Sequence, residues 1–347
     1  MGRPTWKAAG MDGRAVTVPL HMATVVIGRN EGERLEPSLS SVRAAGLPLV
    51  YVDSGSGDGS PEVARRLGIP VVELDPSRPF SAARGRNEGL AEALRHWPEI
   101  GYVLFLDGDC TLDPGFPAAA MAKFEQRPDC AIVTGHLGER FPEASVYNRL
   151  CAIEWGSPAG QIENMNALGG IMAARVSALQ QVDGFNEEAI AGEEPDLGVR
   201  LSLAGYSIFK IDAPMATHDA QIMTFGQWWK RAVRGGHALA HRYARHGRSP
   251  LRDGRREFLS DVFWGLTLPL VALLLLWPTR GFSLLLLGGY VLLWQRVRRH
   301  YHHAGLGRSD ARLAARHIVY SKFAHVIGIV RYGINRLRGS FHIIEYK

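Results

Sequence analysis

Cysteine is scarce in this sequence. The three cysteines among 347 residues, Cys110, Cys130 and Cys151, show no paired metal-binding spacing and are odd in number. This argues against a disulfide-stabilised scaffold and favours reduced thiols in a cytosolic domain. The N-terminal stretch also lacks the apolar core of a secretory signal, so a cleaved signal is not expected. Residues 1–21 are polar and weakly patterned, and we expect a flexible tail there.

Negative charge is outweighed by positive charge, which is unevenly placed. The formal net charge is +6, and basic residues gather at 230–256 and 296–299, on either side of an apolar stretch. Because these clusters bracket an apolar stretch instead of alternating with exposed aromatic side chains, no nucleic acid partner is expected. Basic clusters in this arrangement are typical of the flanks of a membrane segment.

The apolar stretch predicts a helical membrane hairpin. Residues 262–277 and 282–294 carry no charge, and the Pro-Thr-Arg-Gly sequence between them predicts a turn. A spanning helix needs about 20 apolar residues. An arm at about 258–277 reaches this length only by including residues 258–261, and an arm at about 281–294 is short. By the positive-inside rule, both basic flanks lie in the cytoplasm, so the protein is held on the cytoplasmic side of the inner (plasma) membrane by a hairpin that enters or crosses the bilayer. Spanning and re-entrant hairpins both fit, and a buried helical pair in a soluble core is the competing interpretation.

An amphipathic helix is predicted after the hairpin. Between residues 311 and 338, apolar residues recur at spacings of three and four, with basic residues between them. Such a helix suits the surface of an anionic membrane. A helix packed on the catalytic domain is the alternative.

Upstream of the hairpin, strand and helix patterns alternate. This alternation predicts an α/β domain whose mainly parallel mixed sheet carries helices on both faces. The expected strands are residues 23–28, 49–54, 71–74 and 102–107, and the expected helices are residues 33–45, 61–67 and 81–97. The expected divisions are a tail at 1–21, the α/β domain at 22–247, a basic linker with the hairpin at 248–300 and the amphipathic region at 301–347.

Polar residues follow the ends of these strands. Asn30 and Glu31 follow the first strand, Asp53 the second, and Asp107 and Asp109 the fourth. Because ligands of such sheets bind beyond the carboxyl ends of the strands, we expect these side chains at one edge. Two carboxylates spaced i, i+2 suit Mg²⁺ or Mn²⁺ together with the phosphate oxygens of a substrate. A solvated Asp-Gly-Asp turn is the alternative.

Two further segments suit a nucleotide. The glycine-rich turn at 53–59 lacks the Gly-Lys-Ser/Thr ending of a P-loop, so it is either a flexible connection or a contact to base or ribose. Arg84 and Arg86, with Asn87, lie near the start of the third helix, where guanidinium groups suit phosphate contacts. Surface ion pairs are the competing role for these arginines.

Four motifs in fixed order carry a family resemblance. They are Asp-Ser-Gly-Ser-Gly-Asp-Gly at 53–59, Arg-Gly-Arg-Asn-Glu-Gly at 84–89, Phe-Leu-Asp-Gly-Asp at 105–109, and Gly-Phe-Asn-Glu followed by Gly-Glu-Glu-Pro-Asp-Leu within 184–197. Together they resemble the inverting nucleotide-sugar glycosyltransferases of family 2, which have the Rossmann-like GT-A fold. The resemblance covers about residues 23–245.

The resemblance implies a nucleotide site and a metal site. The residues implied to line the nucleotide are Asn30, Glu31, Asp53, Arg84 and Asn87. Asp107 and Asp109 match the DXD motif, which holds Mn²⁺ or Mg²⁺ against the donor diphosphate, with Asp109 the more direct ligand. His218 matches a position where many members supply a further metal ligand.

The resemblance also implies a general base. Glu194 aligns with the acid of the family's Glu-Asp-x-Asp motif, and Glu193 and Asp196 are its supporting neighbours. A carboxylate within hydrogen-bond reach takes the proton from an acceptor hydroxyl during attack on the anomeric carbon. Acidic residues followed by proline are also typical of a helix N-terminus, and both interpretations can hold together.

The sequence departs from the family pattern in places. Gly28-Arg29 replaces Pro-Thr or Pro-Ala after the first strand, and glutamate replaces the usual aspartate as base. Residues 227–231 only loosely resemble the QxxRW signature and lack its final tryptophan, which argues against processive polymer synthesis. Arg231 and Arg234 in this segment are instead expected to contact the diphosphate or lipid headgroups.

These features predict a membrane-associated, metal-dependent inverting glycosyltransferase. It would move one sugar from a nucleotide-diphosphate donor to a lipid-linked (polyprenyl) acceptor in bacterial exopolysaccharide or cell-envelope synthesis, in contact with membrane lipids. One alternative is a polyprenyl-phosphate glycosyltransferase, whose phosphate nucleophile needs no general base. A second is a non-catalytic membrane scaffold that keeps the fold.

Overall fold

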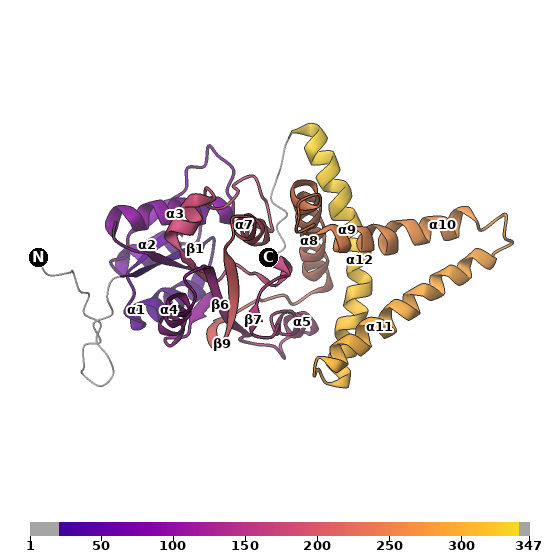
Figure 1. Ribbon diagram of the computed structural model, residues 1–347, viewed down its shortest axis with the longest axis horizontal. Helices are drawn as coiled ribbons and strands as arrows, with labels where there is room; N and C mark the ends of the chain where they lie inside the picture. The colour runs from indigo at the N-terminus through magenta and orange to yellow at the C-terminus, as the bar shows by residue number, and fades with distance from the viewer. Residues whose placement is uncertain (1–20, 340–347) are drawn as a thin grey trace, which may run out of the picture. The chain divides into compact units, whose positions relative to one another are not determined.

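The computed structural model describes residues 21–339, which form two compact units (Figure 1). The first comprises residues 21–141, 155–189 and 193–220, and the second comprises residues 142–154, 190–192 and 221–339. The second unit thus begins well before residue 247, where we expected the α/β domain to end. All but the last residue of the expected tail at 1–21 lies outside the described residues, as do residues 340–347 of the amphipathic region.

A nine-stranded sheet forms the centre of the first unit. Its strands are β1 (Met22–Gly28), β2 (Leu49–Asp53), β3 (Val71–Glu73), β4 (Tyr102–Asp107), β5 (Cys110–Leu112), β6 (Cys130–Glu139), β7 (Gly160–Gln161), β8 (Met172–Arg175) and β9 (Ser207–His218). The order is β3-β2-β1-β4-β8-β6-β9-β5, with β7 paired to β9. The N-terminal strands β3, β2, β1 and β4 are parallel, and β8 and β5 join their neighbours antiparallel. The four strands expected from the sequence are confirmed to within two residues.

Helices cover both faces of this sheet, as the alternating pattern predicted. They are η1 (Gly32–Arg34), α1 (Leu35–Ala44), α2 (Ser60–Arg66), α3 (Ala82–His96), α4 (Phe116–Gln126), η2 (Met165–Ala167), α6 (Val176–Gln181) and α7 (Glu193–Leu203). Because side chains alternate along a strand, Val25 of β1 joins a core with α3, α6 and α7, whereas Val26 joins a core with α1, α2 and α4. The predicted α/β fold with two covered faces is therefore confirmed.

Glycines bring α3 unusually close to β1. A Cβ atom on Gly89 would lie 2.3 Å from Cγ1 of Val25, and one on Gly85 would lie 3.4 Å from Cγ2 of Ile27. These glycines are four residues apart and so lie on one face of the helix. The close contact fixes the start of α3, and with it Arg86, beside the carboxyl ends of the strands.

The second unit is helical. Its elements are α5 (Val146–Glu154), α8 (Phe225–His246), α9 (Arg255–Val262), the π-helical turn η3 (Phe263–Thr267), α10 (Leu268–Leu274), η4 (Phe282–Gly288), α11 (Gly289–His303) and α12 (Arg308–Arg338). Helices α8 and α12 cross in backbone contact, because a Cβ atom on Gly236 would lie 2.2 Å from the carbonyl oxygen of His325. Thus α12 packs on a neighbouring helix of the same unit, and whether it also lies on a membrane surface or on the catalytic domain stays a prediction.

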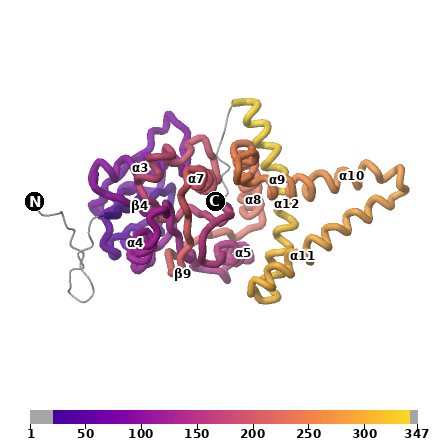
Figure 2. The backbone as a smooth tube through the Cα atoms, viewed as in Figure 1, coloured from indigo at the N-terminus to yellow at the C-terminus, as the bar shows by residue number. Residues whose placement is uncertain are grey.

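The expected hairpin is present as helical structure. Figure 2 shows α10 and the helix that continues into α11 meeting at a tip and spreading apart toward α12. One helix of the described residues, Arg255–Leu274, is long and apolar enough to cross a membrane by length and composition, and 11% of its apolar window is buried. Large apolar side chains are exposed along both arms; examples are Leu273, Leu274, Trp277, Phe282, Leu285 and Leu292. No other part of the 21–339 range covers them.

Candidate active site

The Asp-Gly-Asp tripeptide lies at the end of β4, in the first unit. Asp107 is the last residue of this strand, and the amide of Gly108 donates a hydrogen bond to the carbonyl oxygen of Ile27 on the neighbouring strand (2.8 Å). A Cβ atom on residue 108 would lie 2.9 Å from Cγ of Glu31. Glycine is therefore needed at this position. Because residue 108 has no side chain, Glu31 can lie against the tripeptide.

Asp109 meets His218 across the sheet. Strand β5 pairs with β9 so that Cys110 lies opposite His218, and Oδ2 of Asp109 lies 3.3 Å from Nε2 of His218. The ligand atoms of Asp109, Cys110 and His218 all lie within 4.8 Å of one another. Carboxylate and imidazole suit Mn²⁺ better than a thiol does, so this donor set fits the expected metal through Asp109 and His218.

A second carboxylate lies behind His218. Nδ1 of His218 faces Oε2 of Glu139 at 3.7 Å, and Glu139 in turn accepts a hydrogen bond from the amide of Ala220 (3.2 Å). This separation is longer than a hydrogen bond, so Glu139 acts by placing a negative charge behind the imidazole, on the side away from Asp109. The ring system of Trp155 makes a T-shaped contact with the same imidazole, with ring centroids 4.8 Å apart. The sequence reasoning missed Glu139, since only the pairing of β6 with β9 places it opposite His218.

The buried guanidinium of Arg86 gathers the other acids of the site. Its side chain is 2% exposed, and its Nη2 lies 3.1 Å from Oδ1 of Asp107. Its Nη1 lies 2.9 Å from Oε1 of Glu193 and 3.2 Å from Oε1 of Glu194. Asp107 is thus paired with arginine. Among the described residues, the group whose atoms could hold a metal ion contains Asp109, Cys110 and His218 but not Asp107. A ligand role for Asp107 stays a prediction.

Glu194 and its neighbours begin α7, as the helix-start pattern indicated. Asp196 is buried and pairs with Arg200 one turn further along (2.9 Å), so it stabilises the helix. Glu193 is held by Arg86, whereas Glu194 keeps 15% of its side chain exposed. Burial, followed by repulsion from Glu193, raises the pKa of Glu194 to about 7, while Arg86 opposes the shift. A carboxyl group with this pKa accepts and releases a proton near neutral pH.

The pKa of Asp107 is raised as well. The first cause is desolvation of the carboxyl, and Asp109 adds repulsion, whereas Arg86 and His218 oppose it. Arg86 can neutralise one charge among the three carboxylates that it contacts, so the cluster keeps an excess of acid. Such an excess favours a divalent cation nearby.

The backbone of Gly170 closes one side of this cluster. A Cβ atom there would lie 2.3 Å from Nη2 of Arg86 and 3.1 Å from both Oδ2 of Asp107 and Oε1 of Glu194. A side chain at this position would therefore force the buried guanidinium of Arg86 to shift. Sequence reasoning missed Gly170, although the Gly169-Gly170 pair was a visible signal of close backbone approach.

The residues of the glycine-rich turn at 53–59, which the resemblance assigns to the nucleotide, are held together by hydrogen bonds to Asp53. Asp53 is buried and accepts hydrogen bonds from the hydroxyls of Tyr51 (2.9 Å) and Ser56 (2.6 Å) and from the amides of Gly55 and Ser56. The amide of Gly57 donates to Oδ1 of Asn30 (2.8 Å), which joins the turn to the end of β1. Burial, aided by Asp53, raises the pKa of Tyr51. Asn30 and Asp53 are therefore brought together, and their nucleotide contact stays a prediction.

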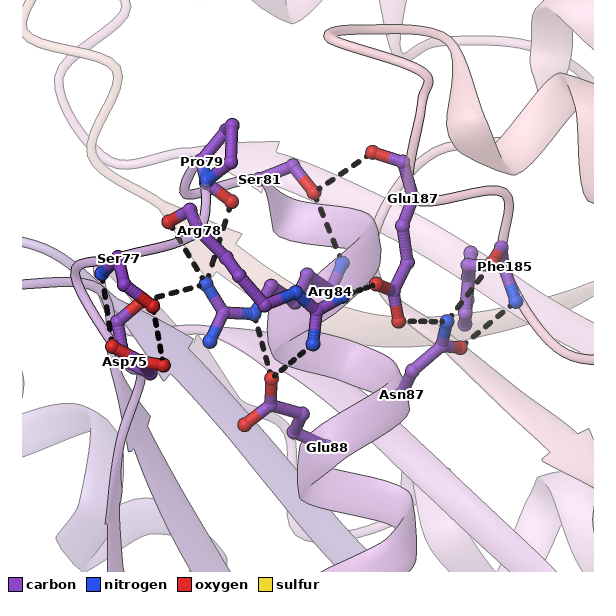
Figure 3. Close-up of polar contacts among 10 residues, drawn as sticks. All are labelled: Asp75, Ser77, Arg78, Pro79, Ser81, Arg84, Asn87, Glu88, Phe185 and Glu187. Atoms are coloured by element: carbon purple, nitrogen blue, oxygen red, sulfur yellow. Dashed lines mark hydrogen bonds and ion pairs between the residues drawn. The ribbon is translucent and has the colours of Figure 1, made fainter.

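Arg84 and Asn87 hold loops in place (Figure 3). Nη1 of Arg84 donates to the carbonyl oxygens of Asp75 (2.9 Å) and Arg78 (3.0 Å), and its Nε pairs with Glu88 (2.6 Å). The side chain is 2% exposed, so in this structure it anchors the loop before α3. Asn87 exchanges hydrogen bonds with the backbone of Phe185, which ties α3 to the 184–187 motif.

Arg231 and Arg234 belong to the second unit. Arg231 forms a paired contact with Glu154 (2.8 and 3.0 Å), and Nη2 of Arg234 donates to the carbonyl oxygen of Ile190 (3.2 Å). Their proposed contact with diphosphate or lipid headgroups stays a prediction.

Comparison with known proteins identifies the family of the first unit. Residues 24–181 match the model of glycosyl transferase family 2. The pre-mycofactocin glycosyltransferase of Mycobacterium tuberculosis is 28% identical over 228 residues, which cover 62% of this chain and 46% of that protein. The succinoglycan biosynthesis protein ExoA of Rhizobium meliloti is 25% identical over 244 residues, or 65% of this chain and 68% of that protein. The chain thus spans less than half the length of the first relative.

A solved structure shows the same fold. The mannosyltransferase PcManGT of Pyrobaculum calidifontis, solved with GDP-Man and Mn²⁺, aligns with a TM-score of 0.56 at 16% identity. The alignment covers 91% of this chain and 88% of that one. The predicted GT-A fold is confirmed by this likeness, and the family resemblance is confirmed by the match of residues 24–181. The chain therefore carries a domain that belongs to glycosyltransferase family 2.

Proposed function

We propose that this chain is a metal-dependent inverting glycosyltransferase that uses a nucleotide-diphosphate sugar. The family match and the two relatives named for glycosyl transfer and succinoglycan biosynthesis support the reaction class. The GDP-Man and Mn²⁺ bound by PcManGT support the kind of donor and metal.

One observation carries the proposal: Arg86 joins Asp107 of the Asp-Gly-Asp tripeptide to Glu194. Both acids contact the same guanidinium, at 3.1 and 3.2 Å. Asp107 ends a strand at the sheet edge where donor phosphates bind in such folds. Glu194, with a pKa near neutrality, is thereby fixed close to the donor, as a base must be.

The roles follow from this geometry. Asp109 and His218 would hold Mn²⁺ or Mg²⁺, whose positive charge would stabilise the departing diphosphate. Glu194 accepts the proton of the acceptor hydroxyl while the oxygen of that hydroxyl forms a bond to the anomeric carbon. The bond from that carbon to the diphosphate oxygen breaks in the same step, and its electron pair leaves with the diphosphate. Arg86 keeps Glu194 and Glu193 in position.

We place the acceptor in a membrane, on the cytoplasmic side, as a lipid-linked (polyprenyl) saccharide. The support is the exposed apolar surface of the α10–α11 hairpin, together with the basic residues that flank it. An enzyme tethered by such a hairpin acts on an acceptor that cannot leave the bilayer. The name of ExoA favours exopolysaccharide synthesis as the setting.

A panel of nucleotide sugars tests the proposal. Because a ligand that binds the folded state stabilises it by mass action, the true donor should raise the melting temperature only when Mn²⁺ is present. The variant Asp109→Ala should lose this shift, whereas Glu125→Gln, an exposed acid on α4, should keep it. If no nucleotide sugar shifts the wild-type transition with Mn²⁺, the proposed donor class is wrong.

A further inference from the structure

A hollow of about 420 Å³ lies between Trp294 of α11 and the first turns of α12, in the second unit. It is lined by Trp294, Ser309, Asp310, Arg312, Leu313 and Arg316. The lining therefore combines the apolar side chains of a tryptophan and a leucine with the guanidinium groups of two arginines. This combination suits a ligand with an apolar part and an anionic part.

The charge of the hollow is positive. Arg312 and Arg316 are exposed, and neither forms an ion pair or hydrogen bond with another residue of the 21–339 range. The single acid of the lining, Asp310, accepts from Nε (3.2 Å) and Nη2 (2.6 Å) of Arg149, which offsets its charge. The guanidinium of Arg298 lies 5.1 Å from the centre of the Trp294 ring and adds a third cation beside the hollow.

The hollow lies at the polar end of the hairpin. Residues 282–294 carry no charge, and Trp294 is the last residue of this stretch, immediately before the basic residues 296–299. Tryptophan at the end of an apolar segment is typical of the membrane–water interface. In a hairpin that enters the bilayer, Arg312 and Arg316 would therefore lie at the depth of the lipid headgroups.

We propose that this hollow binds the headgroup phosphate of an anionic membrane phospholipid. The arginines contact the phosphate through their planar guanidinium groups, while Trp294 and Leu313 contact the glycerol and upper acyl chain. The proposal rests on the proposed membrane position of the hairpin, but it does not depend on the transfer reaction.

Vesicle co-sedimentation of the full chain tests this site. The probes are vesicles of phosphatidylcholine alone and vesicles that also contain phosphatidylglycerol. The double variant Arg312→Gln/Arg316→Gln should bind phosphatidylglycerol vesicles roughly tenfold more weakly, from the usual contribution of basic residues near an anionic surface. The matched control Arg331→Gln/Arg338→Gln removes two exposed arginines of the same helix and should lose no more than about twofold.

A charge-preserving variant separates a built site from diffuse attraction. Arg312→Lys/Arg316→Lys keeps both charges but loses the planar contacts, so it should bind phosphatidylglycerol vesicles several-fold more weakly than wild type. Melting curves equal to that of wild type would exclude unfolding as the cause.

Several outcomes would overturn the proposal. Equal losses in the two glutamine pairs, or unchanged binding of the lysine pair, would mean diffuse attraction without a site. Displacement of wild type by millimolar inorganic phosphate, or selective binding of vesicles with polyprenyl phosphate, would mean a different anion. Equal binding of all variants to both kinds of vesicle would leave the hairpin intact and reject only the headgroup site, whereas loss of donor stabilisation would reject only the transferase.

Discussion

Replacing Glu194 by glutamine tests the group that we propose as the general base. Glutamine keeps the shape of the side chain and an oxygen for Arg86, but it cannot take a proton. The change should therefore abolish base catalysis while leaving the start of α7 in place. A hydroxyl acceptor then predicts a loss of about 10²- to 10⁴-fold in kcat.

Because the pKa of Glu194 is raised, we expect the same substitution to increase the stability of the fold while it lowers the rate. The pKa of Glu194 is about 7 in the folded protein against an ordinary value of 4.5. A shift of this size corresponds to about 3 kcal/mol, at about 1.36 kcal/mol for each pKa unit. Because the folded-state pKa is the higher one, the proton stabilises the fold fully below pH 4.5, and this contribution is lost as pH rises through 7. At pH 8 the variant should thus be more stable than wild type, by up to about 3 kcal/mol.

Two assays check both effects. In wild type, kcat/KM should rise about tenfold between about pH 6 and about pH 8, because the deprotonated fraction of a group with this pKa rises by that factor. Urea unfolding across the same range should show the stability gap between variant and wild type widening with pH. Glu125→Gln, an exposed acid on α4, should follow wild type in both assays.

The reasoning fails if Glu194→Gln and wild type show parallel stability curves from pH 5 to 8. Near-normal turnover of the variant would instead favour a phosphate nucleophile, as in a polyprenyl-phosphate glycosyltransferase, because phosphate needs no base.

Other substitutions test the remaining parts of the site. Gly170→Ala should lower kcat/KM at least about a hundredfold by displacing Arg86, whereas Gly169→Ala, whose Cβ atom would meet nothing within 4 Å, should change it little; equal effects would remove Gly170 from the site. Glu139→Gln should weaken activation by Mn²⁺ about tenfold with the Mn²⁺-saturated rate nearly kept, and an unchanged activation constant would contradict its role behind His218. Arg84→Met should lower the free energy of unfolding by about 3 kcal/mol with little change in donor KM, and a selective rise in KM would restore the phosphate role expected from the sequence.

The sequence predicted the fold and the composition of much of the site because both depend on local patterns. Alternating strand and helix signals placed Asp53, Asp107 and Asp109 at one sheet edge. The motif order indicated Glu194, whose role as the base stays a prediction. Pairing across strands is a different matter, since Glu139 and His218 are 79 positions apart and meet only through the register of β6 and β9.

The two arginines of α3 show where sequence reasoning reached its limit. Arg84 and Arg86 are two residues apart and therefore point to different sides of a helix. The sequence favoured Arg84, but the tight packing of Gly85 and Gly89 on β1 turns Arg86 toward the acids and leaves Arg84 with the loop. Only the rotation of the helix about its axis decides between them, and that rotation is set by packing.

Release of nucleoside diphosphate from the donor identified by thermal shift tests the central claim most directly. The measurement uses membranes that supply acceptor and compares wild type with Asp109→Ala, each with and without Mn²⁺. We predict that wild type releases nucleoside diphosphate only when Mn²⁺ is present, and that the variant releases none under either condition. Release at the same rate by both proteins, or by wild type without a divalent metal, would contradict metal-dependent glycosyl transfer at this site.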